Sequence, residues 1–276
     1  MKKFVIAGFL LFVIISLCAA AGIRDNYSEN LQRNLWILAI GVNEYSNITD
    51  DSGYINLISS SSDAAEFLNT LKSQEGKYYN TVFSLSLTDN DSVPPTKQAI
   101  LESLAFFKQS QPNDTIMLFL SGLGKSEDGL FFFLPQDTIF TGTIEIEHDS
   151  VINMNELAAI MNDFKGRKIL FIDSCGAGAA INSFKNQRNT VVFAASLESE
   201  VSYENALYGG IFAYSLIEGL NGKAANNGFI DLLSLFKYVN EQVIRLSFDR
   251  NNNMSKQTPV IFFPPGFRDY VISAAE

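Results

Sequence analysis

The chain has 276 residues, of which 47% are hydrophobic, and a formal net charge of -10. This composition excludes an intrinsically disordered protein and suffices for a large apolar core. The acidic balance argues against nucleic acid and anionic membrane surfaces as partners.

The first 21 residues have the parts of an export signal. Lys2 and Lys3 precede an apolar run from Phe4 to Leu17, and small residues follow up to Ala21. The run is shorter than the roughly 20 residues of a membrane-spanning helix. We therefore predict a signal peptide over residues 1–21 and an exported protein, periplasmic or secreted, whose net charge after cleavage is -12.

Two alternatives to cleavage stay open. The apolar run could remain as an uncleaved membrane anchor, or Cys18 could carry a lipid, although the bulky Leu17 before it suits lipoprotein processing poorly. Cleavage would leave Cys175 as the one cysteine, so an exported protein would hold a thiol with no partner for an internal disulfide. Such a thiol is either inert and buried or part of a site.

A polar leader over residues 22–34 precedes one predicted domain over residues 35–276. Continuous apolar runs predict strands that are covered on both faces, and apolar residues at helical spacing predict the helices between them. The predicted strands cover residues 35–41, 81–88, 115–120, 168–173, 190–195 and 258–263, with a short extended segment over 131–137. The predicted helices start at Ser61 or Ser62, at residues 94–96, near residue 155, at residue 211 and at the cap Asp231. This alternation predicts an α/β domain with a mostly parallel sheet.

The strand over residues 168–173 ends in Asp173, Ser174 and Cys175, followed by small residues. The carboxyl ends of parallel strands are where open α/β sheets place chemistry, and small residues let backbone N–H groups approach a ligand. A nucleophilic thiol needs a base or a positive field nearby. The one histidine, His148, lies in a polar stretch among acidic residues, and we interpret it as a surface residue and not as a catalytic base.

Taken in order, several segments resemble the caspase-like cysteine peptidases, in particular their bacterial and metacaspase-type members. The matching segments are residues 38–45, 62–64, 114–124, 134–137, 171–175, 194–204 and 210–220. The resemblance implies a three-layer sandwich around a six-stranded sheet, with five parallel strands and an antiparallel last strand. It also implies a Cys/His dyad.

The resemblance assigns the nucleophile to Cys175 and the dyad histidine to the position of Leu123. It places the backbone N–H groups of the oxyanion hole at Gly124 and Cys175, and it makes Asp173 the acidic residue that receives a basic substrate side chain. An alternative for Asp173 is a carboxylate that is hydrogen-bonded to neighbouring backbone N–H groups. Gly176 and Ala177 also depart from the family pattern, which has histidine and serine there.

Two functions follow. The first is an exported pseudopeptidase that binds a peptide or protein partner without cutting it, because Leu123 offers no proton acceptor. The second is an active cysteine endopeptidase that cleaves after basic residues with an unconventional base. We expect no metal and no cofactor in either case, and no membrane contact beyond a possible lipid anchor at Cys18.

Overall fold

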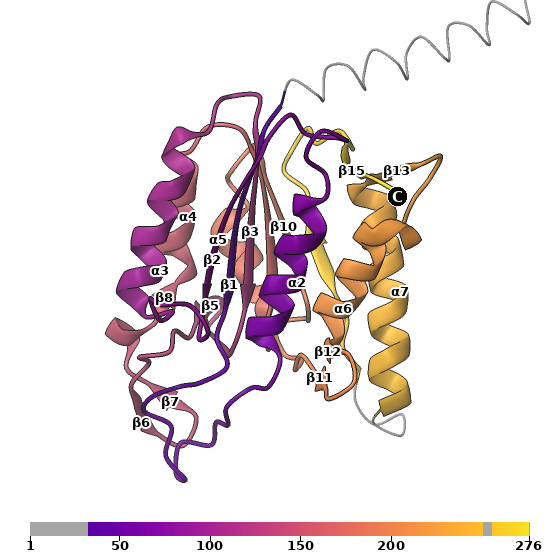
Figure 1. The fold of residues 1–276 in the computed structure, drawn as a ribbon. Helices are drawn as coiled ribbons and strands as arrows, with labels where there is room; N and C mark the ends of the chain where they lie inside the picture. Colours follow the sequence, from indigo (N-terminus) through magenta and orange to yellow (C-terminus); the bar gives the residue numbers. More distant parts are fainter. Residues whose placement is uncertain (1–32, 251–255, 276) are drawn as a thin grey trace, which may run out of the picture.

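The computed structural model describes residues 33–250 and 256–275. Its central feature is a six-stranded sheet with the strand order β14-β10-β9-β3-β1-β2 (Figure 1). Five strands are parallel and β14 is antiparallel to β10. The bounds are β1 Leu35–Gly41, β2 Val82–Thr88, β3 Thr115–Ser121, β9 Arg167–Asp173, β10 Thr190–Ala194 and β14 Val260–Phe262. The predicted fold class is confirmed.

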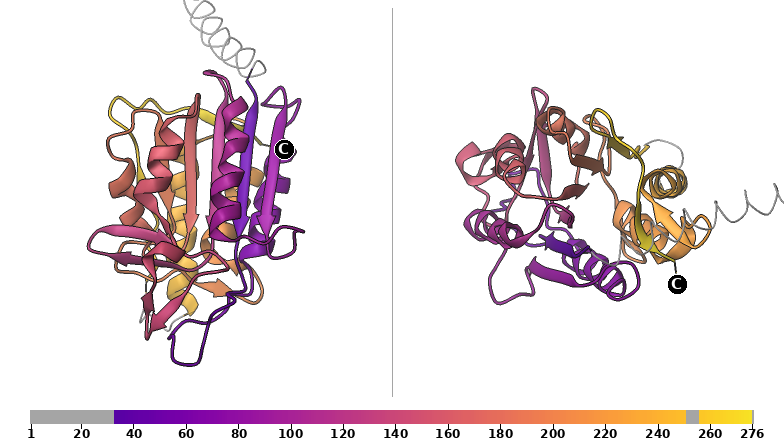
Figure 2. Two further views of the ribbon diagram at one scale, coloured as in Figure 1. Left: turned by 90° about the vertical axis from the view of Figure 1, so that its left-hand side faces the viewer. Right: turned by 90° about the horizontal axis from the view of Figure 1, so that it is seen from above.

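Helices cover both faces of this sheet and complete three layers (Figures 1 and 2). One face carries α2 (Ser60–Lys72), α6 (Ile211–Glu218) and α7 (Leu232–Arg250). The other face carries α3 (Lys97–Ser103), the 3-10 helix η1 (Leu104–Gln109), α4 (Met154–Asn162) and α5 (Ile181–Phe184). Short helical turns are η2 (His148–Ser150), η3 (Ala177–Ala180) and the π-helical η4 (Gly219–Lys223).

Strand β1 shows why the apolar runs form central strands. All seven of its residues are buried. Successive side chains of a strand point to opposite faces, so Leu38 and Ile40 join the core under α3 and α4, while Ile37 and Ala39 join the core under α2 and α6. A strand with helices on both sides therefore needs an unbroken apolar sequence.

Several small sheets were not predicted. The strands β4 (Gly124–Glu127), β5 (Leu130–Phe133) and β8 (Ile152–Asn153) form one, where the sequence indicated only an extended segment. The pairs are β6 (Phe140–Gly142) with β7 (Glu145–Ile146), β11 (Glu204–Asn205) with β12 (Gly209–Gly210), and β13 (Phe229–Asp231) with β15 (Val271–Ala274). The β4–β5 turn uses Asp128 and Gly129, both with positive φ, which is the Asp-Gly chemistry of a tight hairpin.

Some helix ends differ from the prediction. Helix α2 starts at Ser60 after the cap residue Ser59, whose hydroxyl donates to Glu204 and accepts from no helical N–H group. Thr96 caps α3 by accepting from the Ala99 N–H group, and the helix tightens into η1 after Ser103. The predicted cap Asp231 is confirmed, since its carboxylate accepts from the Ser234 N–H group at 2.7 Å.

Among the described residues, no helix combines the length and apolar character that are needed to cross a membrane. The signal peptide, the possible anchor at Cys18 and nearly all of the leader fall on residues 1–32, which lie outside the described part of the chain. Those expectations stay predictions.

Candidate functional site

The register of β3 and β9 brings the two dyad positions to one place. Ser121 at the end of β3 pairs with Asp173 at the end of β9, and the Gly122 N–H group donates to the Asp173 carbonyl at 3.2 Å. Leu123 and Cys175 each follow two residues later. Both line one cavity at the carboxyl end of the sheet.

Leu123 is half-buried and packs against the apolar core under α3 and α4. Its N–H group donates to the Tyr45 hydroxyl at 2.6 Å, and its carbonyl accepts from the Leu134 N–H group at 3.0 Å. Tyr45 is 4% exposed, and burial raises the pKa of its phenol far above the usual range, so it stays neutral. The backbone of this loop is therefore held on both sides, while the Leu123 side chain contributes only packing.

Gly124 begins β4 opposite Phe133. Because Leu123 directs its carbonyl toward β5, the N–H group of Gly124 faces the other side of β4 and is not used by the β4–β5 ladder. A Cβ atom at Gly124 would lie 2.2 Å from the Ser174 Oγ and 2.6 Å from the Phe131 ring, so a side chain has no room. The buried Ser174 hydroxyl has no hydrogen-bond partner among the described residues.

Cys175 is half-buried, and its sulfur contacts the loop that follows β10. The Ser202 N–H group donates to the Cys175 Sγ at 3.3 Å, and the Ser202 carbonyl lies 3.8 Å from the same sulfur. Burial raises the pKa of this thiol above its usual value, and the Ser202 N–H group opposes the shift without cancelling it. A thiol with a raised pKa is mostly protonated at neutral pH and is a weak nucleophile.

Asp173 is buried and points toward α6. Its carboxylate accepts from the Ser202 hydroxyl at 2.7 Å and from the Ala213 N–H group at 3.1 Å. Burial raises the pKa of this carboxyl to about 6 despite the two donors. Asp173 is therefore a hydrogen-bonded carboxylate, as in the alternative to substrate binding. Its donors, however, lie far along the chain and are not its sequence neighbours.

Asp63 in the first turn of α2 is a second buried carboxyl beside the first. Its Oδ2 accepts from the Gly210 N–H group at 2.9 Å, and a Cβ atom at Gly210 would lie within 3 Å of oxygens of both Asp63 and Asp173. Burial, and then the charge of Asp173, raise the pKa of Asp63 to about 8. No described lysine or arginine pairs with either of these buried carboxyls, so a basic group of a ligand would stabilise them.

Glu204 closes this cavity from β11. Its carboxylate accepts from the N–H groups of Ile58 and Ser59 and from the Ser59 hydroxyl. The remaining cavity measures about 40 Å³ and is lined by Asp63, Leu123, Asp173, Cys175 and Glu204, among others. That volume holds a few water molecules.

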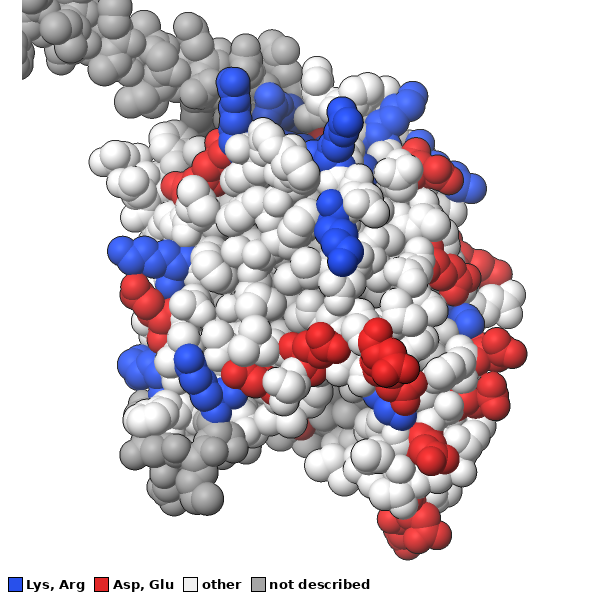
Figure 3. Space-filling view, turned by 180° about the vertical axis from the view of Figure 1, so that it is seen from behind, with Lys and Arg blue, Asp and Glu red and all other residues white. Residues whose placement is uncertain are grey.

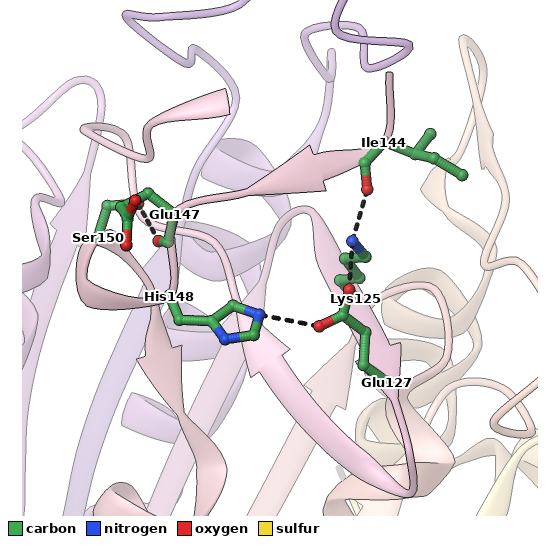
Figure 4. A network of polar contacts seen from close by, with 6 residues as sticks. All are labelled: Lys125, Glu127, Ile144, Glu147, His148 and Ser150. Atoms are coloured by element: carbon green, nitrogen blue, oxygen red, sulfur yellow. Dashed lines mark hydrogen bonds and ion pairs between the residues drawn. The ribbon is translucent and has the colours of Figure 1, made fainter. Parts of the chain in front are cut away.

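His148 lies in η2 and has other partners. Its ring stacks on Phe132 with a centroid distance of 4.8 Å, and its Nε2 atom lies 2.9 Å from a carboxylate oxygen of Glu127, which also pairs with Lys125 (Figure 4). The Lys125 contact is the main reason that the pKa of Glu127 is lowered. His148 lines a separate cavity of about 380 Å³ that does not include Cys175, which agrees with its interpretation as a surface residue.

The loops at this end of the sheet are strongly acidic. They follow β1, β2, β3, β9 and β10, and Lys125 is their one lysine or arginine. Their acidic residues are Glu44, Asp50, Asp51, Asp89, Asp91, Glu127, Asp128, Asp137, Glu145, Glu147, Asp149, Glu198, Glu200 and Glu204. On the face shown in Figure 3, acidic side chains gather in the lower part, toward this end.

Sequence reasoning located the loops but missed part of the site. It named Leu123, Gly124, Asp173 and Cys175, and the structure brings all four to the same end of the sheet. It assigned no role to Asp63, although an acidic residue that opens a helix after a strand of a parallel sheet is a usable signal. Nothing local in the sequence indicated that Glu204 reaches across to α2, because that contact joins residues 145 positions apart.

Comparisons with known proteins identify the family to which the chain belongs. No curated protein matches the chain. A solved structure of the protein GSU0716 from Geobacter sulfurreducens is similar, with a TM-score of 0.56 and 14% identity over 83% of this chain and 92% of that one, a likeness of fold alone. The family profile described as "Caspase domain" matches residues 35–267, which include every site residue named above. This chain therefore belongs to the caspase domain family.

Proposed function

We propose that this chain is an exported caspase-domain protein that binds a basic segment of a peptide or protein partner without cleaving it. The observation that carries the proposal is Leu123, which stands at the position that the resemblance assigns to the histidine and lines the same cavity as Cys175. A leucine neither accepts a proton nor stabilises a thiolate. By analogy with the removal of a triad member, the loss of the base costs on the order of 10⁴ in rate, about 5–6 kcal/mol of barrier.

The environment of the sulfur adds to this effect. Burial raises the pKa of Cys175, so the fraction of thiolate at neutral pH is smaller than for a free cysteine. The Nε2 atom of His148, which could otherwise serve as a base, is engaged with Glu127 in a different cavity. Neither feature supplies the activation that a nucleophile needs.

Binding does not depend on the missing imidazole. The N–H group of Gly124 stays outside the β4–β5 ladder and can donate to a peptide carbonyl. Asp63 and Asp173 form a buried carboxyl pair that a lysine or arginine would neutralise, and the acidic loops around them attract basic chains. These features support a basic ligand over a neutral or acidic one.

The test compares three proteins on one fluorogenic Arg peptide: the natural chain, Leu123→His, and Leu123→His combined with Cys175→Ala. We expect no turnover by the natural chain, measurable turnover after Leu123→His, and loss of that turnover in the double variant. Robust cleavage by the natural chain that Cys175→Ala abolishes would overturn the proposal and favour the active endopeptidase. A silent Leu123→His protein would mean that the decay of the site extends to Gly176 and Ala177.

A further inference from the structure

Basic side chains gather at the end of the sheet that is opposite to the site. All five parallel strands begin there, and each is preceded by at least one lysine or arginine. These residues are Arg33 before β1, Lys72 and Lys77 before β2, Lys108 before β3, Lys165 before β9, and Lys185 and Arg188 before β10. We call this set the basic end.

The basic end is exposed, and the five connections that carry it hold few acidic residues, while Asp231 and Asp269 lie beside it in β13 and before β15. Except for Arg33, which is half-buried, all of its members are exposed. The same connections hold the exposed acids Glu75 and Asp163, whereas the carboxylate of Asp114 is buried and accepts from the Trp36 indole and two backbone N–H groups. In Figure 3, lysine and arginine side chains line the upper part of the face shown, with a few acidic side chains between them.

The negative net charge of the whole chain predicts repulsion from an anionic surface, but the charges are segregated. The central strand β3 has seven residues, so its two ends lie about 23 Å apart at the rise of an extended chain. The Debye length at physiological ionic strength is roughly 8 Å, so a surface that touches the basic end is largely screened from the acidic loops. The local charge therefore decides the interaction.

The path of the chain indicates that the anionic surface which contacts the basic end is a membrane. The chain reaches β1 through Arg33, at the basic end, and fifteen residues separate Arg33 from the apolar run that ends at Leu17. Such a tether spans at most about 50 Å even when fully extended. Whenever the apolar run or a lipid on Cys18 sits in a bilayer, the tether that leads to it leaves the domain at the basic end.

We propose that the basic end docks on anionic lipid headgroups and that the acidic loops with the Cys175 cavity face away from the membrane. Lysine and arginine near an anionic leaflet are attracted within about one Debye length, and the attraction is additive over several residues. The docking is electrostatic, because it rests on exposed lysine and arginine side chains. It does not depend on peptide binding at the opposite end.

The experiment uses a protein that starts at Gly22, because the described helices and strands and both cores lie after residue 33 and the apolar run would bind vesicles by itself. Co-sedimentation is measured with vesicles of phosphatidylcholine alone and with 30% phosphatidylglycerol. The test variant is Lys108→Glu with Lys165→Glu, and the matched control is Lys97→Glu with Lys256→Glu. Both pairs change the net charge equally, but Lys97 opens α3 at the acidic end and Lys256 precedes β14.

We expect binding to the anionic vesicles alone, a loss of at least 10-fold in the test variant, little change in the control, and weakening as salt rises. Lys72→Glu with Arg188→Glu should repeat the loss, and circular dichroism checks that each variant is folded. Equal losses in test and control would show a net-charge effect and overturn the proposal. Equal binding to neutral vesicles, no binding at all, or tighter binding to duplex DNA at the same salt concentration would also overturn it.

Discussion

The two ends of the sheet differ in charge and in the burial of the carboxyls at the site. At the carboxyl end, Cβ atoms placed on Gly41, Gly124 and Gly210 would come within 2.2 to 2.6 Å of neighbouring atoms. At the amino end, such a Cβ would lie 2.5 Å from the Asp114 carbonyl oxygen at Gly166, whereas Gly76 in the turn before β2 has no atom within 4 Å. Asp63 and Asp173 are buried together at the first end, whereas the lysines and arginines of the basic end are exposed apart from the half-buried Arg33.

The difference between the two ends shows that the buried carboxyls at the site lower the stability of the folded protein. An exposed lysine keeps its hydration and costs little, but two adjacent buried carboxyls lose hydration and repel each other when ionised. Folding retains Asp63 and Asp173 together in spite of that cost. Such an arrangement is typical of a binding site and not of a structural core.

The largest expected effect comes from crowding the site. Gly124→Ala should lower the free energy of unfolding by about 3 kcal/mol, because its Cβ would overlap the Ser174 hydroxyl and the Phe131 ring. Gly76→Ala should cost about 1 kcal/mol, since only its positive φ of 70° opposes a side chain. Denaturant unfolding measures both. Adding Ser174→Ala should recover part of the Gly124→Ala loss, and equal costs at both glycines would contradict the crowding at Gly124.

The pH dependence of stability should reveal the buried carboxyls. The folded state raises the pKa of Asp63 to about 8 and that of Asp173 to about 6, so between pH 4 and 8 it holds protons that the unfolded chain has released. Stability must then fall as pH rises, by on the order of 2 to 3 kcal/mol from pH 6 to 8. Thermal or denaturant unfolding at several pH values checks this. Asp63→Asn should flatten the profile, and an unchanged slope in that variant would rule out Asp63 as its source.

The preference for a basic peptide should also depend on Asp63 and Asp173, with a smaller change in free energy than the pH dependence of stability. A peptide with arginine should bind about 10-fold more tightly than the same peptide with citrulline, its neutral isostere, which corresponds to about 1.4 kcal/mol. The preference should grow from pH 6 to 8 as Asp63 ionises. Fluorescence anisotropy measures the affinities. The paired substitutions Asp63→Asn and Asp173→Asn should remove the preference, whereas its persistence would place the recognition of charge in the outer acidic loops.

The smallest effect is expected at His148. Its ring is stacked on Phe132 and paired with Glu127, but 58% of its side chain is exposed, so His148→Ala should cost less than about 1 kcal/mol. The rate at which iodoacetamide alkylates Cys175 should stay unchanged in this variant. A slower reaction, with the pH profile of an imidazole, would instead identify His148 as a base for the thiol.

Much of the fold could be predicted from the sequence because strong local patterns determine it. The unbroken apolar runs of β1, β3 and β9 identify strands that are covered on both faces, and the Asp-Ser-Cys stretch after β9 identifies the edge where a site would lie. The strands β13 and β15 escaped prediction, since the residues that they pair with lie 40 to 45 positions away along the chain.

The features of the site likewise fall into those that the sequence determined and those that only the tertiary structure decided. The sequence determined that a thiol ends one central strand, that leucine stands where the family resemblance assigns a histidine, and that the loops at this edge are acidic. Only the tertiary structure decided that Asp63 meets Asp173 across Gly210, that Ser202 covers the sulfur and that Glu204 closes the cavity. The physical reason is that a pKa shift depends on burial and on neighbours brought together from distant segments, and these follow from the packing of helices on the sheet and not from local sequence.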